Sequence, residues 1–163
     1  MDELAEEYGA RGFQSFFLYV REAHPGELLP HHTSFAQKLA HARTFRDEHH
    51  VRRPILVDGL EGPLHRLLGA MPNMTWILLR GGTIAYKAAW TATADVRRAV
   101  DEIVGIPELR RQGGRLAPIW TERLGYRVVD QAAFMRGLER NGPKAVAEFA
   151  DFMRQTRLDQ LDE

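Results

Sequence analysis

The sequence predicts a mixed α/β fold, and three observations lead to this prediction. Short apolar runs rich in aromatic and β-branched residues alternate with longer segments whose apolar residues recur at helical spacing. Two of the strand-like runs are separated by a turn at Gly81-Gly82, as in a β-hairpin. The chain has 163 residues, 44% of them hydrophobic and 27% charged, which is enough for one globular domain with a buried core.

The first half of the chain contributes two predicted helices and two predicted strands. Residues 2–8 form a short acidic helix, and the aromatic run at 13–20 forms a buried strand. A helix over residues 34–47, capped by Thr33 or Ser34, then leads to a strand at 55–57. Strands and helices therefore alternate, as they do when helices cover a sheet.

A hairpin and a helix close this core. A helical turn at residues 64–68 precedes the two hairpin strands, which we place at 75–79 and 83–87. A helix over residues 94–104 follows, because its apolar residues recur every three or four positions. The predicted order is helix, strand, helix, strand, helical turn, strand, strand, helix.

Three regions are predicted along the chain. Residues 1–104 form the α/β core, residues 105–118 form a linker, and residues 119–163 form a mostly helical extension packed on the core. Within the extension, Tyr126–Asp130 is a candidate strand. Two amphipathic helices, at 131–140 and 144–156, are separated by Asn141-Gly142-Pro143.

Composition excludes several classes of function. Lys plus Arg and Asp plus Glu both number 22, so no net field draws the chain to nucleic acid or to an anionic membrane, and we expect neither partner. No run of 18 apolar residues and no signal peptide is recognised, which makes a cytoplasmic location the expectation. The chain has no cysteine, so it forms no disulfide and offers no thiolate nucleophile or ligand.

Residues 13–104 resemble the iodothyronine deiodinase family, a branch of the thioredoxin-like superfamily. The matching stretches, in chain order, are FFLYVREAHPGE, HTSFAQKLAHAR, RRPILVDGLEG, GAMPNMTWILLRGGTIAYKAAW and DVRRAVDEI. The resemblance implies a thioredoxin-like three-layer core. It departs from the family in the loop from Glu27 to His32, which is shorter and lacks the family's tryptophan.

A larger departure lies at the start of the chain. In the family, a central strand and a loop with cysteine or selenocysteine precede the helix that residues 2–8 resemble, and neither is found in this sequence. The resemblance therefore implies an incomplete or rearranged central sheet. Three repairs are open: pairing of 13–20 with 75–79, a replacement strand from Tyr126–Asp130, or a second copy of the chain. We favour a shifted sheet covered by the tail, with a homodimer as a plausible addition.

Tyr19, Glu22, His24 and His32 are the candidate catalytic residues. The resemblance implies that these four line the reactive pocket and handle protons. Independently of it, Glu22 and His24 alternate along an extended segment, so their side chains share a face, and a carboxylate raises the basicity of a neighbouring imidazole. The alternative is structural: Arg21 and Glu22 are solvated and His24 caps the turn. Both interpretations stay open.

The candidate substrate pocket adds Asp58, Met71, Pro72 and Trp90. The resemblance implies that Met71-Pro72 is a cis peptide bond that faces the active site. Asp58 ends a strand, where sites of α/β proteins gather, although capping of the next helix is the simpler role. Trp90 follows a strand in loop-like sequence and is a candidate ligand wall, while most such residues are core. The histidine spacing matches no zinc motif, so we expect neither metal nor cofactor.

The expected function is a cysteine-free, thioredoxin-like, non-redox enzyme. Its Glu/His/Tyr pocket would perform acid–base chemistry on a small organic molecule, by isomerisation, cyclisation, dehydration or hydrolysis. Two alternatives remain. The first is a non-catalytic module that binds a ligand or dimerises, and the second is a truncated thiol-dependent oxidoreductase whose nucleophile lies upstream of the sequence.

Overall fold

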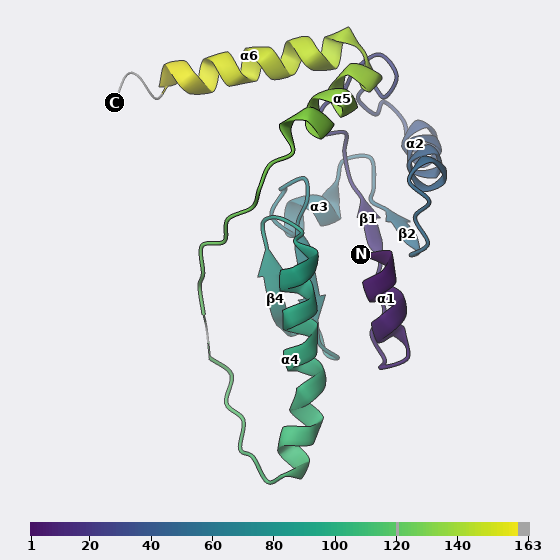
Figure 1. Ribbon diagram of the computed structural model, residues 1–163. Helices are drawn as coiled ribbons and strands as arrows, with labels where there is room; N and C mark the ends of the chain where they lie inside the picture. The colour runs from purple at the N-terminus through teal and green to yellow at the C-terminus, as the bar shows by residue number, and fades with distance from the viewer. Residues whose placement is uncertain (120, 160–163) are drawn as a thin grey trace.

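The computed structural model describes residues 1–119 and 121–159, and it confirms the mixed α/β class. These residues form six helices and two small two-stranded sheets (Figure 1). The thioredoxin-like core remains an expectation, because the two sheets are not joined into one within the described part of the chain.

The first sheet is parallel and places the candidate site at its carboxyl end. Strand β1 (Phe17–Tyr19) pairs with β2 (Ile55–Val57), with Tyr19 opposite Val57. Parallel strands need a crossover connection, which here contains α2 (Phe35–Glu48). Ser34 caps this helix, because its hydroxyl accepts a hydrogen bond from the Gln37 backbone N–H at 3.2 Å.

The second sheet is the predicted hairpin. Strands β3 (Thr75–Leu78) and β4 (Ile84–Ala88) pair antiparallel, and both glycines of the turn have positive φ, 91° for Gly81 and 86° for Gly82. Only residues without a Cβ adopt this conformation readily, which explains the Gly-Gly pair. The short helix α3 (Pro63–Leu67) connects β2 to this hairpin.

Helices α1 (Asp2–Gly9) and α4 (Thr93–Arg111) pack on the hairpin. One buried cluster joins all three elements: Leu4 and Tyr8 of α1, Ile77 of β3, and Val96 and Val100 of α4. Figure 1 shows α4 lying across the hairpin. The Tyr8 hydroxyl also donates a hydrogen bond to Asp101 of α4, which adds a polar contact to the apolar interface between α1 and α4.

The opposite side of α1 faces the first sheet. Asp2 accepts a hydrogen bond from Arg53 Nε at 2.5 Å, and Arg52 Nε lies 2.6 Å from the Glu6 carboxylate. Arg52 and Arg53 immediately precede β2. Helix α1 therefore connects the two sheets, with its apolar side on the hairpin and its carboxylates on the residues that lead into β2.

Two of the proposed repairs of the sheet are wrong. In the described residues β1 pairs with β2 and β3 pairs with β4, and no pairing joins β1 to β3. Tyr126–Asp130 forms no strand, and the side chains of Tyr126 and Val128 are 91% and 97% exposed. Instead, Arg127 stacks on the ring of Trp90 at 3.7 Å, so this segment passes the side of the core without running along a strand edge.

The segment predicted as a linker, residues 105–118, begins as helix. Helix α4 continues through Gly105 and Pro107 to Arg111, and residues 112–119 and 121–130 form neither helix nor strand. A Glu108–Arg111 ion pair at 2.6 Å and a bond from Gln112 to Glu108 at 2.8 Å support the last turns. The two helices of the extension are confirmed as α5 (Gln131–Asn141) and α6 (Pro143–Asp159).

The extension docks on the core through Asn141. Its backbone oxygen accepts hydrogen bonds from the N–H groups of Glu27 and Leu28, at 2.9 and 3.2 Å. Its carboxamide accepts from the Leu29 N–H at 2.7 Å and donates to the His24 oxygen at 2.6 Å. One residue thus holds the loop that follows β1 by four hydrogen bonds.

Two glycines make this approach possible. A Cβ built on Gly26 would lie 2.3 Å from the Asn141 oxygen, and one on Gly142 would lie 2.1 Å from a Glu27 carboxylate oxygen. Gly142 also has a φ of +109°. The same Glu27 carboxylate accepts a bond from the Lys144 N–H at 3.0 Å and so caps the start of α6.

We expect Gly26→Ala to destabilise the protein and Gly137→Ala to stabilise it. The first change forces the loop away from Asn141, at a cost of about 1–3 kcal/mol. Gly137 lies in α5 with nothing within 4 Å of a built Cβ, so alanine there adds about 0.5–1 kcal/mol. Urea unfolding of the two variants measures both values. Equal effects of the same sign would contradict this account of the docking contact.

Candidate functional site

A polar cluster forms where β1 ends. Tyr19 is the last residue of the strand, is 7% exposed, and donates a hydrogen bond from its hydroxyl to the Glu22 carboxylate. Its ring packs on Phe45 of α2 and on the imidazole of His32, with centroids 6.0 and 5.9 Å away. Because Tyr19 is wedged between the helix and the loop, the strand sets the position of the Glu22 carboxylate.

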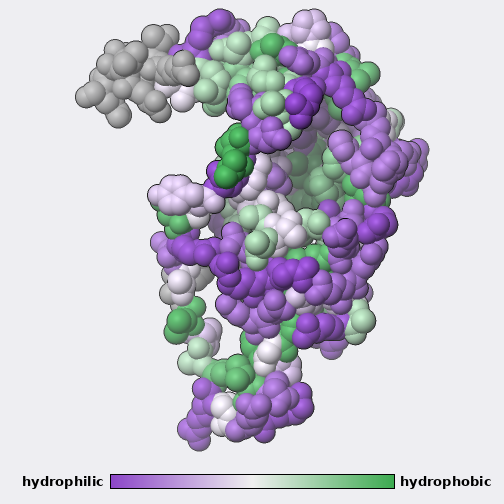
Figure 2. Space-filling view, in the orientation of Figure 1, coloured by the Kyte–Doolittle hydropathy of each residue, from purple (hydrophilic) through white to green (hydrophobic). Residues whose placement is uncertain are grey.

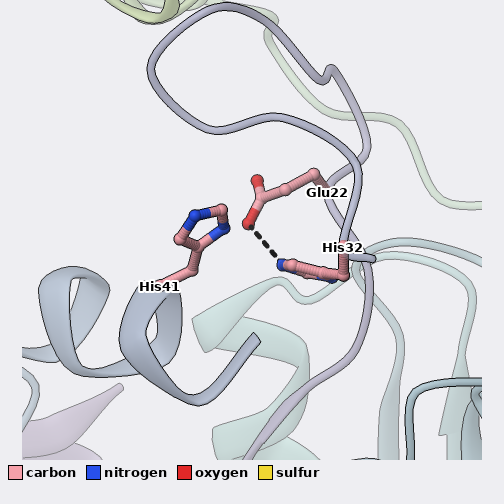
Figure 3. Close-up of side chains that lie close together, drawn as sticks. All are labelled: Glu22, His32 and His41. Carbon is pink, nitrogen blue, oxygen red and sulfur yellow. Dashed lines mark ion pairs between the residues drawn. The ribbon is translucent and has the colours of Figure 1, made fainter. Parts of the chain in front are cut away.

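Glu22 and His32 lie next to each other. His32 Nε2 lies 3.8 Å from a Glu22 oxygen, and the two side chains are 6% and 17% exposed (Figure 3). Burial first, and then the electrostatic effects of His41, Lys38 and His31, together lower the pKa of His32 to about 4. The imidazole is therefore neutral at pH 7, so its contact with Glu22 is not an ion pair at that pH.

His41 is the member of the cluster that the sequence prediction missed. It extends from α2 toward the other two side chains in Figure 3, and its ring centroid lies 5.1 Å from that of His32. One ligand atom each from Glu22, His32 and His41 lie within 4.8 Å of one another. Helical spacing offered a signal, because His41 shares the inner side of α2 with the buried Lys38 and Ala42.

Two nitrogens in this cluster are buried without a hydrogen-bond partner. They are Nε2 of His32 and Nδ1 of His41. The great majority of buried polar side-chain atoms have a partner, so such a pair calls for an explanation. Both nitrogens are close to the Glu22 carboxylate, and a neutral imidazole nitrogen accepts a proton, a hydrogen bond or a cation.

His24 does not join the cluster, which corrects the sequence prediction. Its ring packs edge-on against Phe134 of α5 and Phe149 of α6, with centroids 5.2 and 5.7 Å away. Partial burial lowers its pKa below the usual histidine value. The prediction assumed an extended chain from Glu22 to His24, but β1 ends at Tyr19 and the backbone bends at residues 23–24. His24 therefore anchors the tail helices.

Asp58 has the structural role that the sequence favoured. It is 5% exposed and accepts hydrogen bonds from the N–H groups of Gly59, Leu64 and His65, at 2.8, 3.2 and 2.8 Å. Burial alone raises its pKa, but these three bonds and the charge of Lys38 outweigh it, so the pKa lies below the usual value. Asp58 thus caps α3.

Met71, Pro72 and Trp90 do not line the cluster. Within the described residues no peptide bond is cis, so the expectation of a cis bond before Pro72 is wrong. Met71 is 48% exposed, and its oxygen lies 3.1 Å from Nε2 of His65. Trp90 is 42% exposed under the Arg127 guanidinium. Met71 and Trp90 thus contact neighbours outside the polar cluster.

The two cavities that stand out lie elsewhere. One, of about 390 Å³, lies between α1, residues 14–16 and residues 52–54. The other, of about 440 Å³, lies between the end of α5 and the first turns of α6. Neither cavity is lined by Tyr19, Glu22, His32 or His41. The candidate site is therefore identified by the arrangement of its side chains and not by a cavity.

No protein-family model, no curated protein and no solved structure matches the chain. Among the described helices, none is long and apolar enough to cross a membrane.

We expect Asp58→Asn to destabilise the protein by about 1–3 kcal/mol at neutral pH, because buried N–H groups lose their charged acceptor. A carboxylate whose folded pKa is lowered stabilises above the unfolded value, 3.8, and this stabilisation is lost as the pH falls through the folded pKa. The variant should therefore show a smaller loss of stability in acid than the wild type, by urea unfolding between pH 7 and pH 3.

Asp47→Asn is the matched control, because the Asp47 side chain is 66% exposed and pairs only with the neighbouring Arg46 in the described structure. A similar loss in both variants would contradict the capping role of Asp58.

Proposed function

We propose that this chain is an enzyme that performs acid–base chemistry on a small organic molecule without a thiol. The observation that supports the proposal is the Tyr19–Glu22–His32 arrangement. A partly buried carboxylate is held by a tyrosine hydroxyl and faces a neutral imidazole whose Nε2 has no hydrogen-bond partner. A carboxylate fixed beside an imidazole in a sheltered site is an arrangement suited to moving protons.

Glu22 is the proposed base. Its side chain retains 17% exposure, so a small molecule can reach it. Tyr19 acts as a donor, because burial first, and then the hydrogen bond and charge of Glu22, raise its pKa well above the usual tyrosine value. Its proton therefore stays on the hydroxyl at neutral pH. The hydroxyl orients Glu22 or, when Glu22 is protonated, donates a hydrogen bond to an oxyanion of the substrate.

His32 positions the reacting molecule. With a pKa of about 4 it is a weak base at neutral pH, and its free nitrogen accepts a hydrogen bond from a substrate N–H or O–H. His24, a member of the expected set, is left out of this proposal because its ring packs between α5 and α6. His41 takes its place beside His32.

The surface near the site is concave. Figure 2 shows a recess with hydrophobic residues in its floor, between the α5–α6 unit and α2. The carboxyl end of β1 leads toward it in Figure 1. An apolar floor beside a few polar groups is typical of small-molecule sites, which supports an organic substrate.

We expect Glu22→Gln to lower turnover by about 100-fold or more, because a fixed general base contributes about 10²–10⁴-fold to rate. Aryl esters, small ketones and β-hydroxy acids are the substrate panel, followed by proton NMR for hydrolysis, α-proton exchange and dehydration. His31→Gln is the matched control, since His31 is the exposed neighbour of His32. Wild-type turnover in the Glu22→Gln/His32→Gln double variant, or no turnover by the wild type on any class, would contradict the proposal.

A binding or dimerising module is the second candidate. One edge of β1 and one edge of β3 have no strand partner in the described structure, and unpaired edges invite another chain. The nearby tail segment also exposes apolar side chains, Leu124 at 78% and Val128 at 97%. This proposal predicts a homodimer by light scattering that Val128→Lys converts to monomer. Monomers at all concentrations would exclude it.

A further inference from the structure

Three side chains from two segments meet at one point. Glu22 and His32 lie on the loop after β1, and His41 lies on α2. Their side chains point toward a common centre in Figure 3, with one ligand atom from each within 4.8 Å of the other two. Ligands of a tetrahedral zinc ion lie about 2.0–2.2 Å from the metal and hence about 3.4 Å from one another. Spacings of up to 4.8 Å therefore have to shorten by about 1.4 Å or less when a metal ion binds.

The nitrogens that face this point are unsatisfied. His32 has a 6% exposed side chain, and its Nε2 and the Nδ1 of His41 are both buried without a hydrogen-bond partner. Two imidazoles that only packed in the core would be expected to use these atoms in hydrogen bonds. A ligand that accepts electron pairs from both rings satisfies them together, and the carboxylate beside them balances its charge.

We propose that Glu22, His32 and His41 bind one divalent transition-metal cation, Zn²⁺ in the first instance, with a fourth position open to water. Two imidazoles and one carboxylate form a donor set that catalytic zinc sites use, and three protein ligands leave that position free. Imidazole donors favour zinc and its neighbours over Mg²⁺ and Ca²⁺, which prefer oxygen ligands. The absence of a zinc motif in the sequence does not weigh against this, because the ligands are assembled by the fold.

Tyr19 has a positioning role in this site. Its hydroxyl donates to the Glu22 carboxylate and leaves the other carboxylate lone pairs for the metal. Hydrogen bonds to a ligand orient it and commonly change metal affinity by about 10–100-fold. Lys38, from the same helix as His41, places a positive charge near the site; it is 1% exposed, and its ammonium donates to the Gly59 oxygen at 2.9 Å beside the Asp58 carboxylate. That carboxylate offsets the repulsion between Lys38 and a bound cation.

The proposed metal site adds to the proposed function, but zinc binding does not require that the chain turns over a substrate. It rests on the same site. Water bound to zinc loses its proton near pH 7, which would supply the strong base that neutral His32 cannot. A metal site without catalysis and catalysis without a metal are both open to experiment, and they give different results.

The test is a zinc titration of the full chain without an affinity tag, after treatment with a chelator. We expect one equivalent of Zn²⁺ bound by calorimetry in the wild type and in the His31→Gln control. His32→Gln, His41→Gln and Glu22→Gln should each weaken binding by more than about 100-fold, and Tyr19→Phe by about 10–100-fold. Co²⁺ should give the intense visible absorption of a tetrahedral site in the wild type and lose it in the ligand variants.

A measurement on the unaltered chain guards against misfolded variants. Zn²⁺ should shift the NMR signals of the His32 and His41 rings and leave those of His31 unchanged. Wild-type affinity in the His32→Gln/His41→Gln variant, or ring signals that move equally in all three histidines, would overturn the metal site. Zinc binding without turnover would refute only the proposed function, and chelator-resistant turnover that still needs Glu22 would refute only the metal.

Discussion

The arrangement of the site depends on the contact between Asn141 and the loop after β1. This loop carries Glu22 and His32 but has no regular secondary structure of its own, so its backbone groups need partners from elsewhere. Asn141 forms four hydrogen bonds with this loop, and the partners are separated by up to 117 residues in the chain. Gly26 and Gly142 allow the two backbones to approach, and Glu27 ties α6 to the same point. The tail is therefore a structural part of the site.

Beneath the loop, the first sheet and α2 complete the cluster. Tyr19 connects the strand to the loop, and α2 contributes both His41 and the buried Lys38. The charge of Lys38 is held by the oxygen of Gly59 and by Asp58, which also caps α3. Burial first, and then neighbouring charges, keep His32 neutral at pH 7, so the Glu22 carboxylate faces an uncharged imidazole. That state suits proton transfer or cation binding better than a stabilising ion pair, which would gain little from a partly exposed carboxylate.

Helix α1 links the two sheets. Leu4 and Tyr8 pack α1 on β3 and α4, while Asp2 of the same helix pairs with Arg53 next to β2. This leaves one edge of β1 and one of β3 without a strand partner in the described residues. β1 thus has an open edge, and the residues that follow it carry the polar cluster.

Local patterns were enough to predict the α/β class, the hairpin at Gly81-Gly82, the helix capped by Ser34 and the break at Asn141-Gly142-Pro143, because each depends on residues close together in the chain. The hydrogen bond between Tyr19 and Glu22 could be predicted for the same reason, because the two residues are three positions apart. The sequence could not place His41 beside His32 or send His24 to the tail helices. Those positions were decided by tertiary packing, since β1 ends at Tyr19 and the loop beyond it takes its course from contacts with α2 and with Asn141, and Asn141 lies 112 residues from Leu29 in the chain.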